Sequence, residues 1–374
     1  MRIALNLVSL VPGETGGAET FARGLVPALA REAGPEALTL FVAPELAVEL
    51  RVAPWAPGAR VHTLPVPGRS RIRRTLAEQT LLPLAVHRSG ADVLHNLQST
   101  APVYAGARAV VTTVLDLLYL HHPDTHSRLR RRGMAVLVPL AVRRSDRIIA
   151  ISQATKDDLV RSLGTPPGKI DVVHLGPGLV GTAVPTPEAQ LRARLGLGTA
   201  PILLSPSARR AHKNLDRLLD AFARVPGAPV LVAPGYATGA EPALVARAQR
   251  LGVADRVRFT GWLSDEDLEG LYEAATALVF PSLAEGFGLP VLEAMRHGLP
   301  VACADRTSLP EITGDAALLF DPESTDAIAE AMRTLLSDAT LAARLGEAGR
   351  RRAEQFSWER AARETLASYE RALA

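Results

Sequence analysis

The sequence has little cysteine, little lysine and few aromatic residues. Its one cysteine, Cys303, excludes an internal disulfide framework and a zinc site built on cysteines. Because apolar residues flank Cys303, we expect its thiol to pack in a core. Aromatic residues make up 4% of the chain and do not alternate with basic ones. With no recognition-helix pattern and no zinc knuckle, this argues against nucleic acid as a partner.

Long hydrophobic runs are also missing. A helix that spans a bilayer needs roughly 18 apolar residues, whereas the longest candidate, residues 134–142, is short, contains Pro139 and is flanked by arginines. Residues 1–7 lack both a long apolar stretch and a small-residue cleavage site, so we interpret them as a first strand and not as a signal peptide. We therefore expect a cytoplasmic protein.

The chain itself suits a globular protein of two domains. It has 374 residues, 47% of them hydrophobic and 22% charged, which is more than one ordinary domain needs. Short β-branched or leucine-rich runs alternate with amphipathic stretches, first over residues 3–8, 38–42, 61–64, 93–95, 110–114 and 147–151. After a loop rich in glycine and proline, the alternation restarts over 202–205, 230–233, 257–259, 277–280, 301–303 and 317–320.

Strands that alternate with crossover helices form parallel sheets between two helix layers. The sequence thus predicts an α/β fold of two doubly wound, Rossmann-like domains, over residues 1–180 and 181–356. We expect one helix over 325–354, and a last helix over 358–373 that begins after Ser357 and packs back on the first domain. Ligands of such sheets bind at the carboxyl ends of the strands, so the cleft between the domains is the expected site.

Positive charge is concentrated in the first half of the chain. Residues 1–178 carry 21 Lys and Arg against 14 Asp and Glu, and the remainder carries 21 against 25. Much of the excess comes from two arginine clusters, at positions 69, 71, 73 and 74 and at positions 128, 130, 131 and 132. Such clusters are compatible with a solvated surface or with peripheral contact to anionic lipid at the inner face of the membrane.

The most informative segment, residues 280–295, leads from a strand into a helix. Pro290 suits the first helical position and Gly298 the stop, which predicts a helix of about eight residues. The N–H groups that we expect to be free at its start belong to Leu289, Val291 and Leu292. With the helix dipole behind them, they predict a phosphate site. The loop before the helix, Gly286, Phe287 and Gly288, lets a bulky group approach the backbone.

Two carboxylates belong to this segment. Glu285 lies in the loop and Glu293 lies one turn inside the helix, so they can contact different parts of one extended ligand. Vicinal hydroxyls, as in a sugar or a ribose, donate well to a carboxylate. The alternative is that Glu293 only complements the helix dipole and that Glu285 is a solvated loop residue.

A second turn from strand to helix, residues 205–214, is basic. It contains Lys213, one of only three lysines among 42 basic residues, together with Arg209 and Arg210. A compact ammonium suits a phosphate oxygen, although an exposed, interchangeable basic residue is the alternative. We expect this turn and residues 280–295 to converge on one pyrophosphate. A glycine-rich turn at 13–19, with Gly16 and Gly17, is not the dinucleotide fingerprint and is weak evidence alone.

Together these segments resemble the retaining GT-B glycosyltransferases of family 4. The similarity rests on Gly-Gly-Ala-Glu at 16–19, Arg-Arg-x-His-Lys-Asn at 209–214, the pair Glu285 and Glu293, and Phe-Ser-Trp-Glu at 356–359. These motifs span nearly the whole chain. The resemblance implies a nucleotide-sugar donor held mainly by the C-terminal domain and a hydroxyl acceptor held mainly by the N-terminal domain. It also implies transfer with retention, with no metal and no cofactor.

The resemblance also assigns roles to individual residues. Lys213, with Arg209 or Arg210, would neutralise the departing diphosphate. Glu285 would hold hydroxyls of the donor sugar, and Glu293 would hold the ribose. Gly16 and Gly17 would close on the diphosphate. Gly261, Trp262 and Leu263 would line the base.

One position departs from the family pattern. Members commonly carry His-Asp after a first-domain strand, where this chain has Leu115 and Asp116. A leucine cannot bond the C6 hydroxyl of a donor sugar, and burying that hydroxyl unpaired costs about 1 to 3 kcal/mol. We therefore expect a 6-deoxyhexose or pentose donor. His121 or His122 could substitute for the missing histidine, and His95 is interpreted as a packing residue.

Two other functions fit the same architecture. A nucleotide-sugar epimerase would use the same donor residues but needs acid and base groups around the sugar, of which the first domain offers few. A non-catalytic GT-B auxiliary subunit is supported only by Leu115. The acceptor stays open among a sugar, a lipid-linked sugar and a small metabolite.

Overall fold

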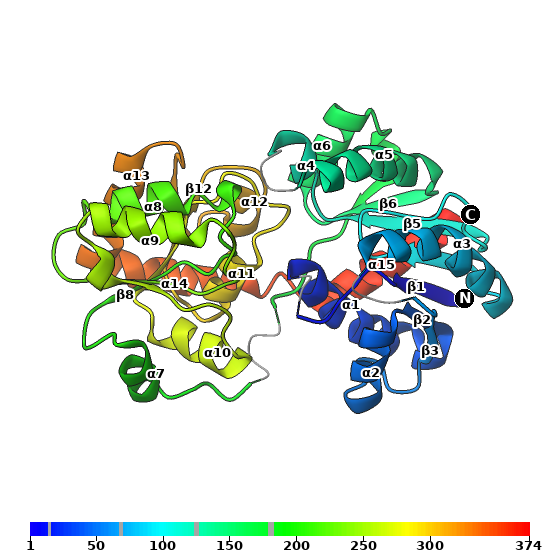
Figure 1. Cartoon of the computed structure of the whole chain (residues 1–374), viewed down its shortest axis with the longest axis horizontal. Coiled ribbons are helices and arrows are strands. Elements are labelled where there is room, and N and C mark those ends of the chain that lie inside the picture. The colour runs from blue at the N-terminus through cyan, green and yellow to red at the C-terminus, as the bar shows by residue number, and fades with distance from the viewer. Residues whose placement is uncertain (14–15, 67–69, 123–126, 179–182) are drawn as a thin grey trace. The chain divides into compact units, whose positions relative to one another are not determined.

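The computed structural model describes residues 1–13, 16–66, 70–122, 127–178 and 183–374. The chain forms two compact units: unit 1 is Met1–Gly176 with Phe356–Ala374, and unit 2 is Pro177–Gln355. Each unit contains one parallel sheet flanked by helices (Figure 1), so the predicted class of two doubly wound α/β domains is confirmed. The boundary that we expected at residue 180 falls outside the described residues.

Unit 1 contains a seven-stranded parallel sheet of order β3-β2-β1-β4-β5-β6-β7. Its strands are β1 (Ile3–Leu7), β2 (Leu38–Val42), β3 (Arg60–Thr63), β4 (Val93–Asn96), β5 (Ala109–Val114), β6 (Arg147–Ala150) and β7 (Ile170–Val172). β7 was not predicted from the sequence.

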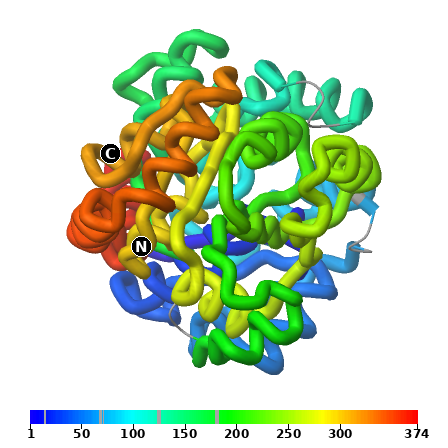
Figure 2. Tube along the Cα trace, turned by 90° about the vertical axis from the view of Figure 1, so that its left-hand side faces the viewer, coloured from blue at the N-terminus to red at the C-terminus, as the bar shows by residue number. Residues whose placement is uncertain are grey.

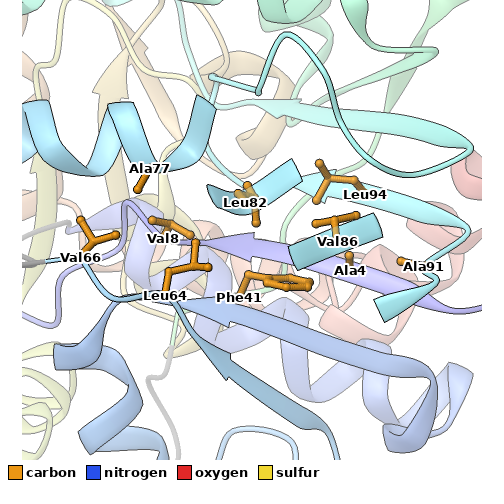
Figure 3. Packing of buried hydrophobic residues seen from close by; sticks show 10 residues of the cluster. All are labelled: Ala4, Val8, Phe41, Leu64, Val66, Ala77, Leu82, Val86, Ala91 and Leu94. Carbon is orange, nitrogen blue, oxygen red and sulfur yellow. The ribbon is translucent and has the colours of Figure 1, made fainter. Parts of the chain in front are cut away.

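Seven α-helices of unit 1 belong to the described residues. They are α1 (Gly17–Ala33), α2 (Pro44–Val52), α3 (Arg71–Ser89), α4 (Leu118–His121), α5 (Arg128–Arg144), α6 (Gln153–Leu163) and α15 (Trp358–Leu373). Buried side chains of α3, among them Leu82 and Val86, pack on Phe41 and Leu94 of the sheet (Figure 3). This cluster forms one part of the core of unit 1.

The prediction of a last helix that packs on the first domain is confirmed. Ser357 caps α15 by accepting a hydrogen bond from the Arg360 N–H at 3.1 Å. The helix packs against α1, where a Cβ on Gly24 would overlap the Trp358 ring. The C-terminal segment thus belongs to unit 1, as the sequence predicts.

Unit 2 contains a six-stranded parallel sheet of order β10-β9-β8-β11-β12-β13. Its strands are β8 (Ile202–Leu204), β9 (Val230–Ala233), β10 (Val257–Phe259), β11 (Ala277–Phe280), β12 (Val301–Ala304) and β13 (Leu318–Phe320). Its α-helices are α7 (Glu188–Leu195), α8 (Leu215–Phe222), α9 (Glu241–Arg250), α10 (Asp265–Ala274), α11 (Leu289–Arg296), α12 (Leu309–Thr313), α13 (Thr325–Ser337) and α14 (Ala339–Ala353). Cys303 is buried in β12, where burial raises its pKa to about 12, so its predicted packing role is confirmed.

The single helix predicted over 325–354 is wrong. Asp338 leaves the helical region, with φ −106° and ψ 85°, and its side chain accepts a hydrogen bond from the Leu341 N–H at 2.8 Å. Asp338 thereby ends α13 and caps α14. Figure 2 shows these two helices as separate coils in orange shades. Among the described residues, no helix is long and apolar enough to cross a membrane.

Candidate functional site

Two turns at the carboxyl edge of the unit 2 sheet are joined by hydrogen bonds. The turn after β8 presents the His212 carbonyl oxygen, which accepts from the Leu283 N–H at 2.7 Å and from Ser282 Oγ at 3.1 Å. Asn214 Nδ2 donates to the Pro281 carbonyl oxygen at 3.1 Å. Residues 205–214 therefore meet residues 280–295, and the predicted convergence of the two segments is confirmed.

Lys213 and Glu285 form an ion pair at this junction. Lys213 Nζ lies 2.6 Å from Glu285 Oε1, and the two side chains are 16% and 11% exposed. The ammonium also lies 5.3 Å from the centre of the Phe280 ring. Partial burial strengthens such a pair relative to a surface ion pair. The structure thus holds a cation and a carboxylate side by side, close to the solvent boundary.

The loop that carries Glu285 is fixed from behind. The Glu285 N–H donates to Thr307 Oγ1 at 2.9 Å. Ser308 Oγ lies within hydrogen-bond distance of the carbonyl oxygens of Glu285 and Phe287, at 3.1 and 2.8 Å. Gly288 has φ 109°, and a Cβ there would lie 2.6 Å from the Leu309 side chain. Glycine is therefore required at the entrance to α11.

The N-terminus of α11 corrects one expectation. The helix begins at Leu289, so Pro290 is its second residue. The N–H groups of Val291 and Leu292 donate to the Gly288 carbonyl oxygen at 3.0 and 3.2 Å. They are therefore not free to bind an anion. The Leu289 N–H has no acceptor among the described residues, so only this one of the three predicted donors is available.

Glu293 lies deeper in the unit than Glu285. It is 8% exposed, and burial raises its pKa to about 7. The Tyr272 hydroxyl donates to Glu293 Oε2 at 2.7 Å, which partly opposes that rise. A Cβ on Gly178 would overlap Glu293 Oε1, so the backbone at Gly178 passes close to the carboxylate. A buried, partnered carboxylate contradicts the alternative of a residue that only complements the helix dipole.

Arg209 does not lie where the sequence suggested. It is 1% exposed, and its guanidinium donates to the carbonyl oxygens of Ala233 and Gly235. Its Nε lies 3.0 Å from Glu241 Oε2. Because these partners occupy the guanidinium inside the unit, Arg209 stabilises the loops and is not available as a leaving-group cation. Arg210 is exposed and forms no ion pair within the described part of the chain, so it remains the candidate.

The loop after β10 carries the predicted base-binding residues Gly261, Trp262 and Leu263. Trp262 is 63% exposed and stacks on Tyr236, with ring centres 4.5 Å apart. The Gly235 N–H donates to the Gly261 carbonyl oxygen at 2.8 Å, which ties the loop after β9 to this one. The pair of rings offers an apolar platform at the carboxyl edge of the sheet.

In unit 1, the glycine turn leads into α1. Gly16 caps the helix with φ 52°, and Gly17 is its first residue. A Cβ on either would meet no atom of the described residues within 4 Å. Glu19 accepts a hydrogen bond from the Gly13 N–H at 2.8 Å and pairs with Arg23 at 2.7 Å. Glu14 and Thr15, the middle of the motif, lie outside the described residues.

Leu115 and Asp116 follow β5. Leu115 is half-buried, and its N–H donates to Ser99 Oγ at 3.3 Å. Asp116 Oδ1 accepts from the Leu118 N–H at 3.0 Å, at the start of α4. The backbone around Leu115 is thus fixed, and the side chain is apolar.

The three histidines considered in unit 1 have different surroundings. His95 is buried between Tyr369 and Thr113, at 2.6 and 2.8 Å, and burial lowers its pKa to about 3, which confirms packing. His121 is held by Asp158 at 2.8 Å. Burial also lowers the pKa of His122. No group of three or more His, Cys, Asp or Glu among the described residues is arranged to hold a metal ion.

Comparison with known proteins decides the family. Residues 15–176 match the family described as Glycosyltransferase Family 4, and residues 188–352 match Glycosyl transferases group 1. The O-antigen chain mannosyltransferase B of Escherichia coli is 31% identical over 69% of this chain and 69% of its own length. The chain belongs to glycosyltransferase family 4. The MMP alpha-(1->4)-mannosyltransferase of Mycolicibacterium hassiacum is likewise 31% identical, over 80% of this chain and 75% of its own.

The fold of this family 4 glycosyltransferase has solved counterparts. Anabaena HepE in complex with UDP-glucose superposes with a TM-score of 0.78 and 22% identity, covering 98% of this chain and 100% of that one. At this identity the likeness establishes the fold alone. It supports the predicted GT-B architecture.

Two aromatic residues of the site were not predicted. Tyr272 bonds Glu293, and its ring stacks on His297, with centres 5.4 Å apart. Tyr236 stacks on Trp262. The sequence offered one general indication for Tyr272, because the hydroxyl of a buried tyrosine usually has a hydrogen-bond partner. The roles of the predicted residues in this glycosyltransferase stay predictions.

Proposed function

We propose that this glycosyltransferase moves a sugar from a nucleotide-diphosphate sugar to an acceptor hydroxyl, with retention and without a metal or a cofactor. The observation that carries the proposal is the ion pair of Lys213 and Glu285 on two joined turns at the carboxyl edge of a parallel sheet. The names of two relatives, both mannosyltransferases, support sugar transfer. The UDP-glucose complex of a protein with this fold supports the class of donor.

In this proposal, Lys213 stabilises the negative charge of the leaving diphosphate. An ammonium has three N–H donors, of which Glu285 occupies one, so the others can bind oxygens of the donor diphosphate. The bond between the anomeric carbon and the diphosphate oxygen breaks, and negative charge develops on that oxygen. A cation held in place beforehand stabilises this charge, and such a group is worth roughly 3 to 4 kcal/mol in the transition state. Arg210 adds a second, exposed cation at the same turn.

The two carboxylates hold hydroxyl groups of the donor. Glu285 Oε1 faces Lys213, and its other oxygen can accept from the donor sugar. Glu293 is proposed for the ribose. Since each carboxylate oxygen can accept two hydrogen bonds, the Tyr272 hydroxyl leaves acceptor capacity on Glu293. The platform of Trp262 and Tyr236 is proposed for the base.

The acceptor is assigned to unit 1, with the turn at Gly16 and Gly17 contacting the donor diphosphate. The new bond forms between the acceptor oxygen and the anomeric carbon, either by attack on the face that the leaving group vacates or after a short-lived covalent intermediate, and the acceptor hydroxyl loses its proton to the departed diphosphate. A half-buried Leu115 favours a donor without a C6 hydroxyl, such as a 6-deoxyhexose or a pentose. A sugar, a lipid-linked sugar or a small metabolite would each supply the hydroxyl, and anionic membrane is proposed as a peripheral contact.

A transfer assay tests the proposal. A panel of UDP, GDP, ADP and dTDP sugars, with and without a C6 hydroxyl, is offered with a set of acceptors, and NMR reads the anomeric configuration of the product. We expect retained configuration and unchanged turnover after chelation of divalent metals. An inverted product would overturn retention, loss of activity on chelation would overturn metal independence, and epimerised donor in the absence of acceptor would overturn transfer.

A further inference from the structure

Helix α5 has two apolar faces. Val138 and Val142 are buried against the sheet in a cluster with Ile148, and Ala141 beside them is also buried. On the opposite side Leu129, Val136 and Leu140 are 75%, 58% and 37% exposed. At 3.6 residues per turn, these three side chains lie within about 40° of one another around the helix axis. They form an apolar stripe that faces solvent along the length of α5.

The charge of α5 has one sign. The helix contains six arginines and no acidic residue. Arg132, Arg143 and Arg144 are exposed and lie within about 60° of the apolar stripe. Arginine side chains flanking an exposed apolar stripe are typical of helices that lie in the interface of an anionic membrane.

Helix α3 shows the same combination. Its exposed apolar residues are Ile72, Leu76, Leu81 and Leu84, between 40% and 67% exposed. Its one acidic residue, Glu78, is buried, so its exposed face carries arginine and no carboxylate. Arg69 of the neighbouring cluster lies outside the described residues.

Strand register places both helices on the same face of the sheet. Leu94, which packs with α3, pairs with Val110, two residues before Thr112 on β5. Thr112 pairs with Ile148, which packs with α5. Paired residues of parallel strands, and residues two apart, point to one face, so α3 and α5 cover it together (Figure 1). We call their exposed sides the α3–α5 surface.

We propose that the α3–α5 surface docks unit 1 on an anionic lipid bilayer. Charge complementarity favours this partner. The surface is positively charged and carries protruding leucine, isoleucine and valine side chains, and an anionic bilayer is negatively charged and takes up apolar groups. Each arginine near such a surface strengthens binding about fivefold. This inference gives a location to the membrane contact in the proposed function and stands whether or not the donor assignment is right.

Sedimentation with vesicles tests the proposal on the full chain. Phosphatidylglycerol and phosphatidylcholine in equal parts form the anionic vesicles, and phosphatidylcholine alone forms the neutral ones. We expect binding to the anionic vesicles that weakens as salt is raised. Val136→Glu and the pair Arg132→Glu with Arg143→Glu should each weaken it about tenfold or more. Val52→Glu and Arg51→Glu, exposed changes on α2 that match them in chemistry, should leave binding unchanged.

Circular dichroism confirms that each variant is folded before its binding is compared. Absence of wild-type binding to anionic vesicles, equal binding to neutral ones, or equal losses in the α2 controls would overturn the proposal. So would a dimer in solution that Val136→Glu dissociates without change in vesicle binding, since the surface would then contact a second copy of the chain. Transfer activity plays no part in the readout, so failure here is distinct from failure of the proposed function.

Discussion

Lys213 Nζ and Glu285 Oε1 lie 2.6 Å apart, although 72 residues separate them in sequence. The contact joins the turn after β8 to the loop before α11, and carbonyl and hydroxyl groups of neighbouring residues tie the same two segments. A cation and a carboxylate are therefore held at the carboxyl edge of the sheet, where parallel α/β proteins bind their ligands.

The ion pair predicts the kinetics of its variants. Lys213→Ala and Glu285→Ala should each lower kcat at least about tenfold, because each removes a group that contacts the reacting part of the donor. The double variant should lose less than the sum of the two in free energy, since each single change already breaks the pair. Steady-state rates of the four proteins measure this, with Lys156→Ala as the control. Unchanged turnover in both single variants would contradict the site.

Glu293 predicts how stability depends on pH. Burial raises its pKa from 4.5 to about 7, so the folded protein binds more protons than the unfolded chain between these values. The free energy of unfolding therefore falls as pH rises through this window, by at most about 3 kcal/mol from this residue. Glu293→Gln removes the titrating group and should flatten the fall. Urea unfolding of the variant at pH 5 and pH 8 measures the difference.

Two further variants sharpen the test of Glu293. The exposed change Glu347→Gln should follow the wild-type pH dependence. Tyr272→Phe removes the hydrogen bond that lowers the Glu293 pKa, so the fall should extend to higher pH. Glu269, whose pKa burial also raises to about 7, retains its own contribution in every variant. Parallel curves for Glu293→Gln and wild type would show that this carboxylate does not titrate as described.

The two neighbouring arginines should separate stability from activity. Arg209→Ala leaves Glu241, the buried Ala233 carbonyl group and the half-buried Gly235 carbonyl group without their partner, and should lower the free energy of unfolding by about 3 kcal/mol. Arg210→Ala changes an exposed side chain, so it should leave stability unchanged and lower turnover. Thermal unfolding and initial rates of both variants check this. If instead Arg209→Ala lowers turnover without loss of stability, Arg209 is the cation that contacts the leaving diphosphate.

Leu115 should set the preference for the donor. A leucine leaves a C6 hydroxyl without a partner, whereas Leu115→His offers one, so the variant should shift the ratio of kcat/KM about tenfold toward donors that carry this hydroxyl. Competition between a hexose donor and its 6-deoxy counterpart measures the ratio. Fastest transfer by the wild type from a donor with an intact C6 hydroxyl would remove the assignment.

Much of the fold could be predicted because each buried strand of a parallel sheet is a short apolar run. The run 257–259 was predicted as observed, and so was the last helix, which begins directly after Ser357. β7 and the break at Asp338 could not be predicted. The break at Asp338 depends on a single capping side chain within a continuous helical pattern.

Within the site, the strand topology predicted which segments lie close together, but it could not predict the hydrogen-bond partners of individual side chains. Two turns that follow neighbouring parallel strands must meet at one edge, so the approach of Lys213 to Glu285 could be expected. The inward path of Arg209 depends on carbonyl groups and a carboxylate from residues 233–241, which local sequence around Arg209 does not reveal. The same holds for the hydrogen bond from Tyr272 to Glu293.

The most direct measurement is calorimetric titration of the protein with nucleoside diphosphates, comparing wild type with Lys213→Ala and Lys156→Ala. At least one of UDP, GDP, ADP and dTDP should bind the wild type. Lys213→Ala should raise its Kd about tenfold or more, because a charge-assisted hydrogen bond to phosphate is lost, while Lys156→Ala should not change it. Equal Kd values for all three proteins would contradict the placement of the diphosphate at Lys213.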